Sequence, residues 1–127
     1  MKLPQGGQLQ RKIHIEWSPN FAYAIGLITS DGNLSSDGRH IGFVSKDYEL
    51  IEKFKTALAI NNKVRMGVRG GETAKKYFYV KFGDKVFYNF LNGIGLFSRK
   101  SKTIKFVDIP NNLFKDFLRG LFDGDGT

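Results

Sequence analysis

The spacing of apolar residues changes several times along the chain, and each change marks a new structural element. Ser18 and Pro19 suit the N-cap and the first position of a helix, which we expect to run from Pro19 to about Ser30. Gly32 follows as a candidate left-handed C-cap. A second helix is predicted after Asp47, because its apolar residues recur at helical spacing. Those residues are Leu50, Ile51, Phe54 and Leu58.

Alternation of apolar and polar residues predicts two hairpins. The first lies between Asn33 and Ser45, where two strand-like runs are joined by a turn at Asp37-Gly38. In the second, Lys63–Arg69 and Tyr77–Phe82 alternate with a period of two. The apolar side of this second hairpin is expected to pack on helices. It holds Val64, Met66, Val68, Phe78, Val80 and Phe82.

Two further helices complete the predicted order. A short one is indicated by Val86, Phe87, Phe90 and Leu91, and a basic loop covers residues 93–107. Pro110 precedes the last helix, whose apolar residues are Leu113, Phe114, Phe117, Leu118 and Leu121. The order is helix, two strands, helix, two strands, helix, helix. Hairpin-linked strands mixed with helices predict an α+β fold with an antiparallel sheet.

Two segments of the chain echo each other at a fixed offset. FAYAIGLITSDGN and KDFLRGLFDGDGT align without gaps, and matched residues lie 94 positions apart (120 − 26 and 125 − 31). The identical pairs are Gly26 and Gly120, Leu27 and Leu121, Asp31 and Asp125, and Gly32 and Gly126. A repeat of this length at one offset indicates two related helices rather than coincidence.

The repeated residues are unusual for helices. Asp31 and Asp125 are expected in last turns, where the partial negative charge disfavours a carboxylate by up to about 1 kcal/mol. Gly26 and Gly120 lie within the helices, where glycine costs about 1 kcal/mol relative to alanine. If the helices cross at the glycines, the acids and helix-end carbonyls form an oxygen-rich site suited to Mg²⁺. The candidate metal ligands are Asp31, Asp125, Ser30 and Gly124.

Each feature also has a simpler interpretation. An Asp-Gly pair after a helix is usually a turn, and a glycine within a helix often serves packing alone. The run from Asp123 to Gly126 also resembles the start of a calcium-binding loop, whose remaining ligands the sequence does not reach. The repeated combination of residues favours a paired metal site over these alternatives.

The two motifs, their spacing and the elements between them resemble the LAGLIDADG (dodecapeptide) homing endonuclease family over residues 18–127. The resemblance implies one αββαββα repeat, whose antiparallel saddle sheet sits in the DNA major groove, plus the first helix of a second repeat. It divides the chain into a basic arm (1–17), the first repeat (18–107) and the motif helix of a truncated second repeat (108–127). Ile13, Ile15 and Trp17 are expected to anchor the arm.

The same resemblance implies roles for individual residues. The final acid of each motif, Asp31 or Asp125, binds catalytic divalent metal in the family. A lysine in the basic loop lies near the scissile phosphate, and Lys100 is the first candidate and Lys102 the second. Motif one departs from the family pattern at Thr29, where the family often has an acid. That position is not the metal ligand, so the assignment of Asp31 is unaffected.

Composition and charge agree with a nucleic-acid partner. The chain has a net charge of +8 and a pI of about 9.8, which favours binding to a polyanion. It has no cysteine, which excludes disulfides and thiolate metal sites, and two histidines, which make zinc chemistry unexpected. No apolar run approaches the roughly 20 residues needed to span a bilayer. We therefore expect a soluble intracellular protein, cytoplasmic or, in a eukaryote, organellar.

The polar side of the second hairpin carries alternating cations and aromatic residues. Arginine can pair with guanine edges, whereas lysine mainly contacts phosphate. The first hairpin is expected to extend this surface. The predicted DNA-binding residues are Lys63, Arg65, Arg69, Tyr77, Tyr79, Lys81, Asn33, Ser35 and His40.

The principal functional hypothesis is site-specific, Mg²⁺-dependent hydrolysis of double-stranded DNA. Activity of this chain alone is expected to be incomplete, because the second motif has no second sheet. A missing half-domain, or self-association through the motif helices, would supply the other half-site. The alternative is a non-cleaving DNA- or RNA-binding module of the same fold, such as an intron maturase or a transcription regulator. An excised intein segment is a third interpretation.

Overall fold

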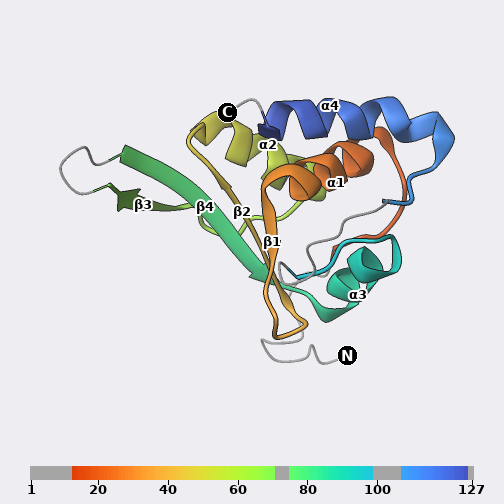
Figure 1. Ribbon diagram of the computed structural model, residues 1–127, viewed down its shortest axis with the longest axis horizontal. Helices are drawn as coiled ribbons and strands as arrows, with labels where there is room; N and C mark the ends of the chain where they lie inside the picture. Colours follow the sequence, from red (N-terminus) through yellow and green to blue (C-terminus); the bar gives the residue numbers. More distant parts are fainter. Residues whose placement is uncertain (1–12, 71–74, 99–106, 126–127) are drawn as a thin grey trace, which may run out of the picture.

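The computed structural model describes residues 13–70, 75–98 and 107–125 of the chain. The helices and strands follow the predicted order (Figure 1). They are α1 (Pro19–Asp31), β1 (Gly32–Leu34), β2 (His40–Ser45), α2 (Tyr48–Leu58), β3 (Arg65–Arg69), β4 (Lys75–Gly83), α3 (Lys85–Gly93), the 3-10 turn η3 (Asn111–Leu113) and α4 (Phe114–Asp125).

Local sequence signals determine where α1 begins and ends. The Ser18 hydroxyl accepts a hydrogen bond from the Phe21 amide at 3.0 Å, and Pro19 occupies the first turn, as predicted. The predicted left-handed cap at Gly32 is wrong, because Gly32 has φ −83° and ψ 168° and is the first residue of β1. Glycine is required there for space: a β-carbon would lie 2.6 Å from the Ile28 carbonyl oxygen. Helix α1 therefore runs directly into the sheet.

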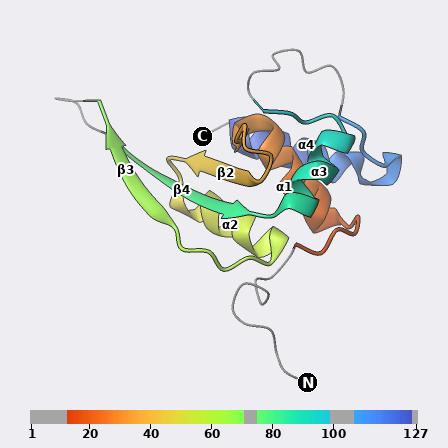
Figure 2. The same cartoon turned by 90° about the horizontal axis from the view of Figure 1, so that it is seen from below.

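The four strands form one antiparallel sheet in the order β1-β2-β4-β3. Helices α1 and α2 pack on one face of this sheet, and α4 packs on α1 (Figures 1 and 2). The turn at Gly38, with φ +78°, joins β1 to β2 as predicted. The fold is therefore the predicted α+β arrangement, with the second motif helix beside the first.

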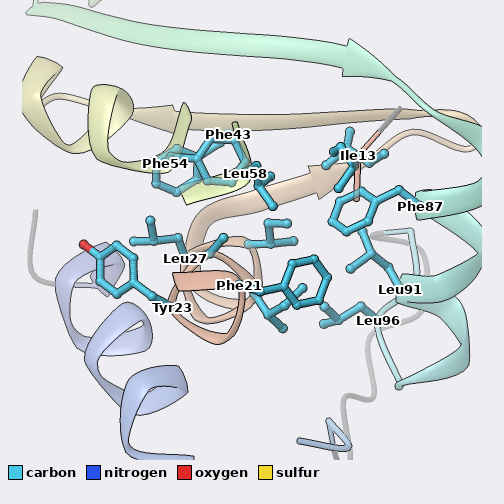
Figure 3. Close-up of a cluster of buried hydrophobic side chains, with 14 of the residues drawn as sticks. Ile13, Phe21, Tyr23, Leu27, Phe43, Phe54, Leu58, Phe87, Leu91 and Leu96 are labelled. Atoms are coloured by element: carbon cyan, nitrogen blue, oxygen red, sulfur yellow. The ribbon is translucent and has the colours of Figure 1, made fainter. Parts of the chain in front are cut away.

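The core lies between the sheet and the helices that cover it. Phe43 of β2 and Phe54 of α2 stack with ring centroids 4.6 Å apart, and both are fully buried (Figure 3). Phe21 of α1 meets Phe87 of α3 edge-on at 6.1 Å. All four predicted apolar residues of α2 are buried, which confirms the helical spacing. Burial of side chains this large is the main source of stability in a domain of this size.

The apolar side of β3 departs from prediction. Met66 and Val68 are 54% and 56% exposed, so the expectation that this side packs on helices is wrong for β3. The strand also begins at Arg65 rather than Lys63. β4 pairs with β2 through Phe78–Gly83 and with β3 through Lys75–Tyr79, so β3 lies beyond the covered part of the sheet. Figures 1 and 2 show β3 and the start of β4 extending past the helices.

The segment before α1 is anchored as expected. The Ile13 amide donates a hydrogen bond to Asp84 at 2.8 Å, and the other Asp84 oxygen accepts from the Phe87 amide to cap α3. Trp17 packs edge-on against Phe21, with centroids 5.2 Å apart. Among the helices in the described residues, none has the length and apolar character to cross a membrane.

Candidate metal centre and nucleic-acid interface

The two motif helices cross at their glycines. A β-carbon on Gly26 would lie 2.8 Å from the Leu121 amide nitrogen and 3.0 Å from the Gly120 α-carbon. A β-carbon on Gly120 would lie 3.0 Å from both the Gly26 α-carbon and the Leu27 amide nitrogen, and it would collide with the Tyr23 carbonyl oxygen. All of these neighbouring atoms belong to the backbone. The two glycines are therefore in direct contact. A side chain at either position would force the helices apart.

The crossing brings the two motif acids together. Asp31 is the last residue of α1 and Asp125 is the last residue of α4, and neither last turn contains a basic residue. Burial raises the pKa of the Asp31 carboxyl, and the neighbouring negative charge of Asp125 raises this pKa further. Two carboxylates thus lie near each other at two helix C-termini. The partial negative charge of the helix ends and the charge of the other carboxylate disfavour each of them unless a cation is present.

The residues before the acids bring the helix ends close. Gly124 is buried, and a β-carbon there would lie 3.0 Å from the Ser30 β-carbon and collide with its hydroxyl. That hydroxyl donates a hydrogen bond to the Leu27 carbonyl oxygen at 3.0 Å within α1. The small size of Gly124 therefore lets the last turn of α4 rest on that of α1.

The donor set at this position suits Mg²⁺. Asp31 is partly buried and Asp125 is exposed, so the pair is open to a solvated ion. Mg²⁺ is commonly held by one or two carboxylates while it keeps several waters. Across the described residues, no group of three or more His, Cys, Asp or Glu side chains could hold a metal ion. An ion at the helix ends would therefore rely on these two acids, with carbonyl, water or phosphate oxygens completing its coordination.

A polar cluster between the motif helices was not predicted from the sequence. The Tyr23 hydroxyl donates a hydrogen bond to Asp123 at 2.7 Å, and the Arg119 guanidinium lies 4.3 Å from the Tyr23 ring centroid. Arg119 in turn donates to the buried Asp116 at 3.1 Å. Burial, followed by the hydrogen bond to Asp123, raises the pKa of the Tyr23 hydroxyl. Tyr23 precedes Gly26 by three residues and Asp123 follows Gly120 by three, so helical spacing from the glycines was the available signal.

Most of the predicted DNA-binding residues have strand positions on the sheet face opposite α1 and α2. Arg65 pairs with Tyr79, Lys81 with Gly42, and Gly42 with Asn33, and directly paired residues share a face. His40 pairs with Gly83 on the same face. Ser35 lies opposite His40, and the Ser35 amide donates a hydrogen bond to the His40 carbonyl oxygen at 2.9 Å. Lys63 is exposed just before β3, and Arg69 pairs with Lys75 at the far end of that strand.

An aromatic pair lies on this face of β4. The Tyr77 and Tyr79 rings are stacked with centroids 6.0 Å apart and an interplanar angle of 29°. Tyr77 lies across Gly67 of β3, where a β-carbon would come within 2.8 Å of the ring. Gly67 thus leaves room for a flat aromatic surface flanked by Arg65 and Lys81. The two lysines predicted near the scissile phosphate, Lys100 and Lys102, lie outside the described residues.

Comparison with known proteins bears on the fold. No family model matches the chain. The Replication factor C small subunit of Methanocaldococcus jannaschii is 32% identical over 124 residues, a match that covers 84% of this chain and 7% of that protein. Full-length DUF199/WhiA from Thermatoga maritima is structurally similar, with a TM-score of 0.50 and 18% identity, over 86% of this chain and 34% of that one. The chain thus spans 7% of the first protein and 34% of the second.

The structural similarity confirms the predicted fold class. The αββαββα arrangement with a four-stranded antiparallel sheet is shared with part of WhiA. At 18% identity, this similarity shows a shared fold and nothing about function.

Proposed function

We propose that this chain is a DNA-binding domain that contacts duplex DNA through the polar face of its sheet. The observation that carries the proposal is the segregation of the two faces. Arg65, Tyr79 and Lys81 share the open face, whereas α1 and α2 pack on the other. Arginine and lysine supply phosphate and base-edge contacts, and a two-stranded ribbon fits the major groove. The net charge of +8 adds long-range attraction.

Salt-dependent binding to a duplex tests this proposal. We would measure anisotropy of a labelled DNA duplex at several salt concentrations for wild type, Arg65→Ala and Lys81→Ala. Each variant should bind more weakly, and loss of one phosphate contact should reduce the salt slope by about 1. Lys53→Ala is the matched control, because Lys53 is exposed on α2, which packs on the opposite sheet face. Equal losses in all three variants would refute a specific role for the sheet.

The same experiment separates DNA from RNA as the ligand. An RNA duplex has a deep, narrow major groove that protein side chains do not read. An unlabelled RNA duplex of the same length should therefore compete less well than DNA. Stronger competition by RNA would favour the RNA-binding alternative.

A second candidate function is metal-dependent phosphodiester hydrolysis. The observation that favours it is the pairing of Asp31 and Asp125 at two helix ends without a basic residue. These acids would hold Mg²⁺, and their own role would be to bind the ion beside the DNA backbone. When bound, the ion would polarise the phosphate and lower the pKa of a bound water. The four-stranded sheet of the described residues would contact about half of a two-sheet target.

Metal binding distinguishes this function from simple DNA binding. Calorimetric titration with Mg²⁺ and Mn²⁺ should give heat of binding for wild type and none for Asp31→Asn or Asp125→Asn. A nicking assay on supercoiled DNA should show the same dependence on both acids. A wild-type chain that binds DNA, binds no divalent ion and does not nick supercoiled DNA would leave DNA binding as the function. Since the chain spans 7% of the curated relative, these proposals rest on its own residues.

A further inference from the structure

A hydrogen bond joins two residues of the motif helices that lie 100 positions apart in the sequence. The Tyr23 hydroxyl of α1 donates to Asp123 of α4 at 2.7 Å. Tyr23 is 4% exposed, and its labelled ring lies beside α4 (Figure 3). The Arg119 guanidinium covers the ring at 4.3 Å and is itself held by Asp116. The Tyr23 hydroxyl is therefore presented to Asp123 from a fixed position.

Three consecutive residues at the end of α4 meet three positions of α1. Asp123 meets Tyr23, Gly124 meets Ser30, and Asp125 lies near enough to Asp31 to raise its pKa. Successive residues of an α-helix are turned by roughly 100° about its axis. Contacts at both residue 123 and residue 124 therefore fix how the last turn is rotated. That rotation determines where the Asp125 carboxylate points.

The repeat shows that this hydrogen bond belongs to one helix end only. At an offset of 94 residues, Tyr23 corresponds to Phe117 and Asp123 corresponds to Thr29. Phe117 has no hydroxyl, and the Thr29 hydroxyl donates to the Ile25 carbonyl oxygen within its own helix at 2.8 Å. The end of α1 is held differently, because Gly32 follows Asp31 directly and pairs with Phe43 in the sheet.

We propose that Tyr23 and Asp123 form a latch that positions Asp125 against Asp31 and thereby sets the metal affinity of the pair. Tyr23 is a positioning residue, since it touches Asp123 and not the metal ligands. The last four carbonyl groups of a helix lack partners within it, and a helix end frays unless other contacts hold it. The latch holds the end of α4, whereas strand pairing of Gly32 holds the end of α1. The inference rests on the proposed metal site, and its first test is independent of metal.

The first test measures amide hydrogen exchange in the last turn of α4. Tyr23→Phe removes the hydroxyl and keeps the ring, so amides of Asp123–Asp125 should exchange roughly tenfold faster or more. Tyr88→Phe is the matched control, because Tyr88 is 5% exposed and donates to the Ser35 carbonyl in the first hairpin. That variant should leave the α4 amides unchanged. Unchanged exchange in Tyr23→Phe would overturn the latch.

The second test measures Mn²⁺ affinity by calorimetry. Loss of a residue that orients a metal ligand typically weakens metal binding about 10- to 100-fold, so Tyr23→Phe should weaken Mn²⁺ binding by about tenfold. Tyr88→Phe should bind like wild type. Equal Mn²⁺ affinity in Tyr23→Phe and wild type would overturn the tuning role. A wild-type chain that binds no Mn²⁺ would instead overturn the proposed metal site. The exchange experiment is done without metal, so its result for the Tyr23–Asp123 contact would still stand.

A pair of substitutions at the other end of the latch guards against a variant that fails to fold. Asp123→Asn keeps an oxygen that can accept from the Tyr23 hydroxyl, whereas Asp123→Ala removes it. The asparagine variant should retain slow exchange at the end of α4, and the alanine variant should lose it. Similar exchange in the two variants would contradict the latch.

Discussion

Gly26 and Gly120 touch where α1 crosses α4, and a β-carbon on either would lie 3.0 Å from the α-carbon of the other. This contact explains why both helices keep a residue that lowers helix propensity. It also makes the two helix ends converge, so that Asp31 and Asp125 lie near each other. One close approach thus determines the geometry of the candidate metal site.

The Gly26→Ala substitution should be strongly destabilising. The new methyl group would lie 2.8 Å from the Leu121 amide nitrogen and collide with the Phe117 carbonyl oxygen, and neither backbone atom can rotate away. Overpacking of this kind costs roughly 1–3 kcal/mol, and we expect the upper end of that range. The melting temperature should fall by about 10 °C. Gly93→Ala is the control, because no atom lies within 4 Å of its added β-carbon. A comparable loss in both variants would contradict the crossing geometry.

The sequence predicted the order of elements because it follows from local spacing, and the repeat of Gly26 and Asp31 at Gly120 and Asp125 indicated that the motif helices could cross. Ser18, Asp47 and the turn at Gly38 act through their nearest neighbours, and the structure shows each where the spacing places it. The Tyr23–Asp123 contact was missed, because it depends on the rotation of two helices about each other. Helical spacing gives the face on which a residue lies, and only the packed structure gives the partner.

The state of Gly32 was mispredicted for a similar reason. A glycine after a helix commonly takes the left-handed conformation, and that statistical preference led to the prediction. Here the chain enters β1 at once, and Gly32 pairs with Phe43 in an extended conformation. Tertiary pairing therefore overrides the usual end of a helix.

The Asp31→Asn substitution should stabilise the metal-free protein at neutral pH. Burial and the charge of Asp125 raise the pKa of Asp31 above its ordinary value of 3.8, so the folded state binds this proton more tightly than the unfolded state. The contribution of Asp31 to the free energy of unfolding therefore falls as pH rises from about 3.8 through the raised pKa. Relief of the acid at a helix end is worth up to about 1 kcal/mol, or about 4 °C. Thermal unfolding in a chelator at pH 3 and pH 7 measures the difference.

Two comparisons make that result specific to Asp31. Added Mg²⁺ should raise the melting temperature of the wild type and leave Asp31→Asn unchanged, because only the wild type would bind the ion in its folded state. Asp37→Asn should behave in the opposite way with pH. Hydrogen bonds from His40 and from the Arg39 amide lower the pKa of Asp37, so its contribution is present at neutral pH and lost on acidification. An Asp31→Asn variant that is less stable than wild type at pH 7 without metal would contradict the paired acids.

The exposed side of β3 gives a prediction about packing. Val68 is 56% exposed, whereas Val80 of the neighbouring strand is fully buried. Val68→Thr should change the free energy of unfolding by no more than about 0.5 kcal/mol, as expected for the surface. Val80→Thr should cost about 1–3 kcal/mol, because it buries a hydroxyl at a position surrounded by apolar side chains. Urea unfolding of both variants measures the contrast, and a large loss in Val68→Thr would show that this side of β3 is covered.

The repeat permits construction of a second latch. Phe117→Tyr and Thr29→Asp together place at the repeat-related positions the residue types that form the Tyr23–Asp123 pair. Phe117→Tyr alone should cost about 1–3 kcal/mol, because Phe117 is 5% exposed and its new hydroxyl would lack a partner. Thr29→Asp alone adds an acid to the last turn of α1 and should cost up to about 1 kcal/mol.

The double variant should be more stable than the sum of these two losses predicts. Urea unfolding of the wild type, both single variants and the double variant gives the coupling energy, which we expect to be about 1 kcal/mol or more. The corresponding cycle with Tyr23→Phe and Asp123→Thr calibrates the natural pair. Additive losses within about 0.5 kcal/mol at residues 29 and 117, beside clear coupling at residues 23 and 123, would show that the two helices do not meet symmetrically. Coupling at both positions would mean that a tyrosine–aspartate pair can hold the end of either motif helix. The natural pair, Tyr23 and Asp123, holds the end of α4.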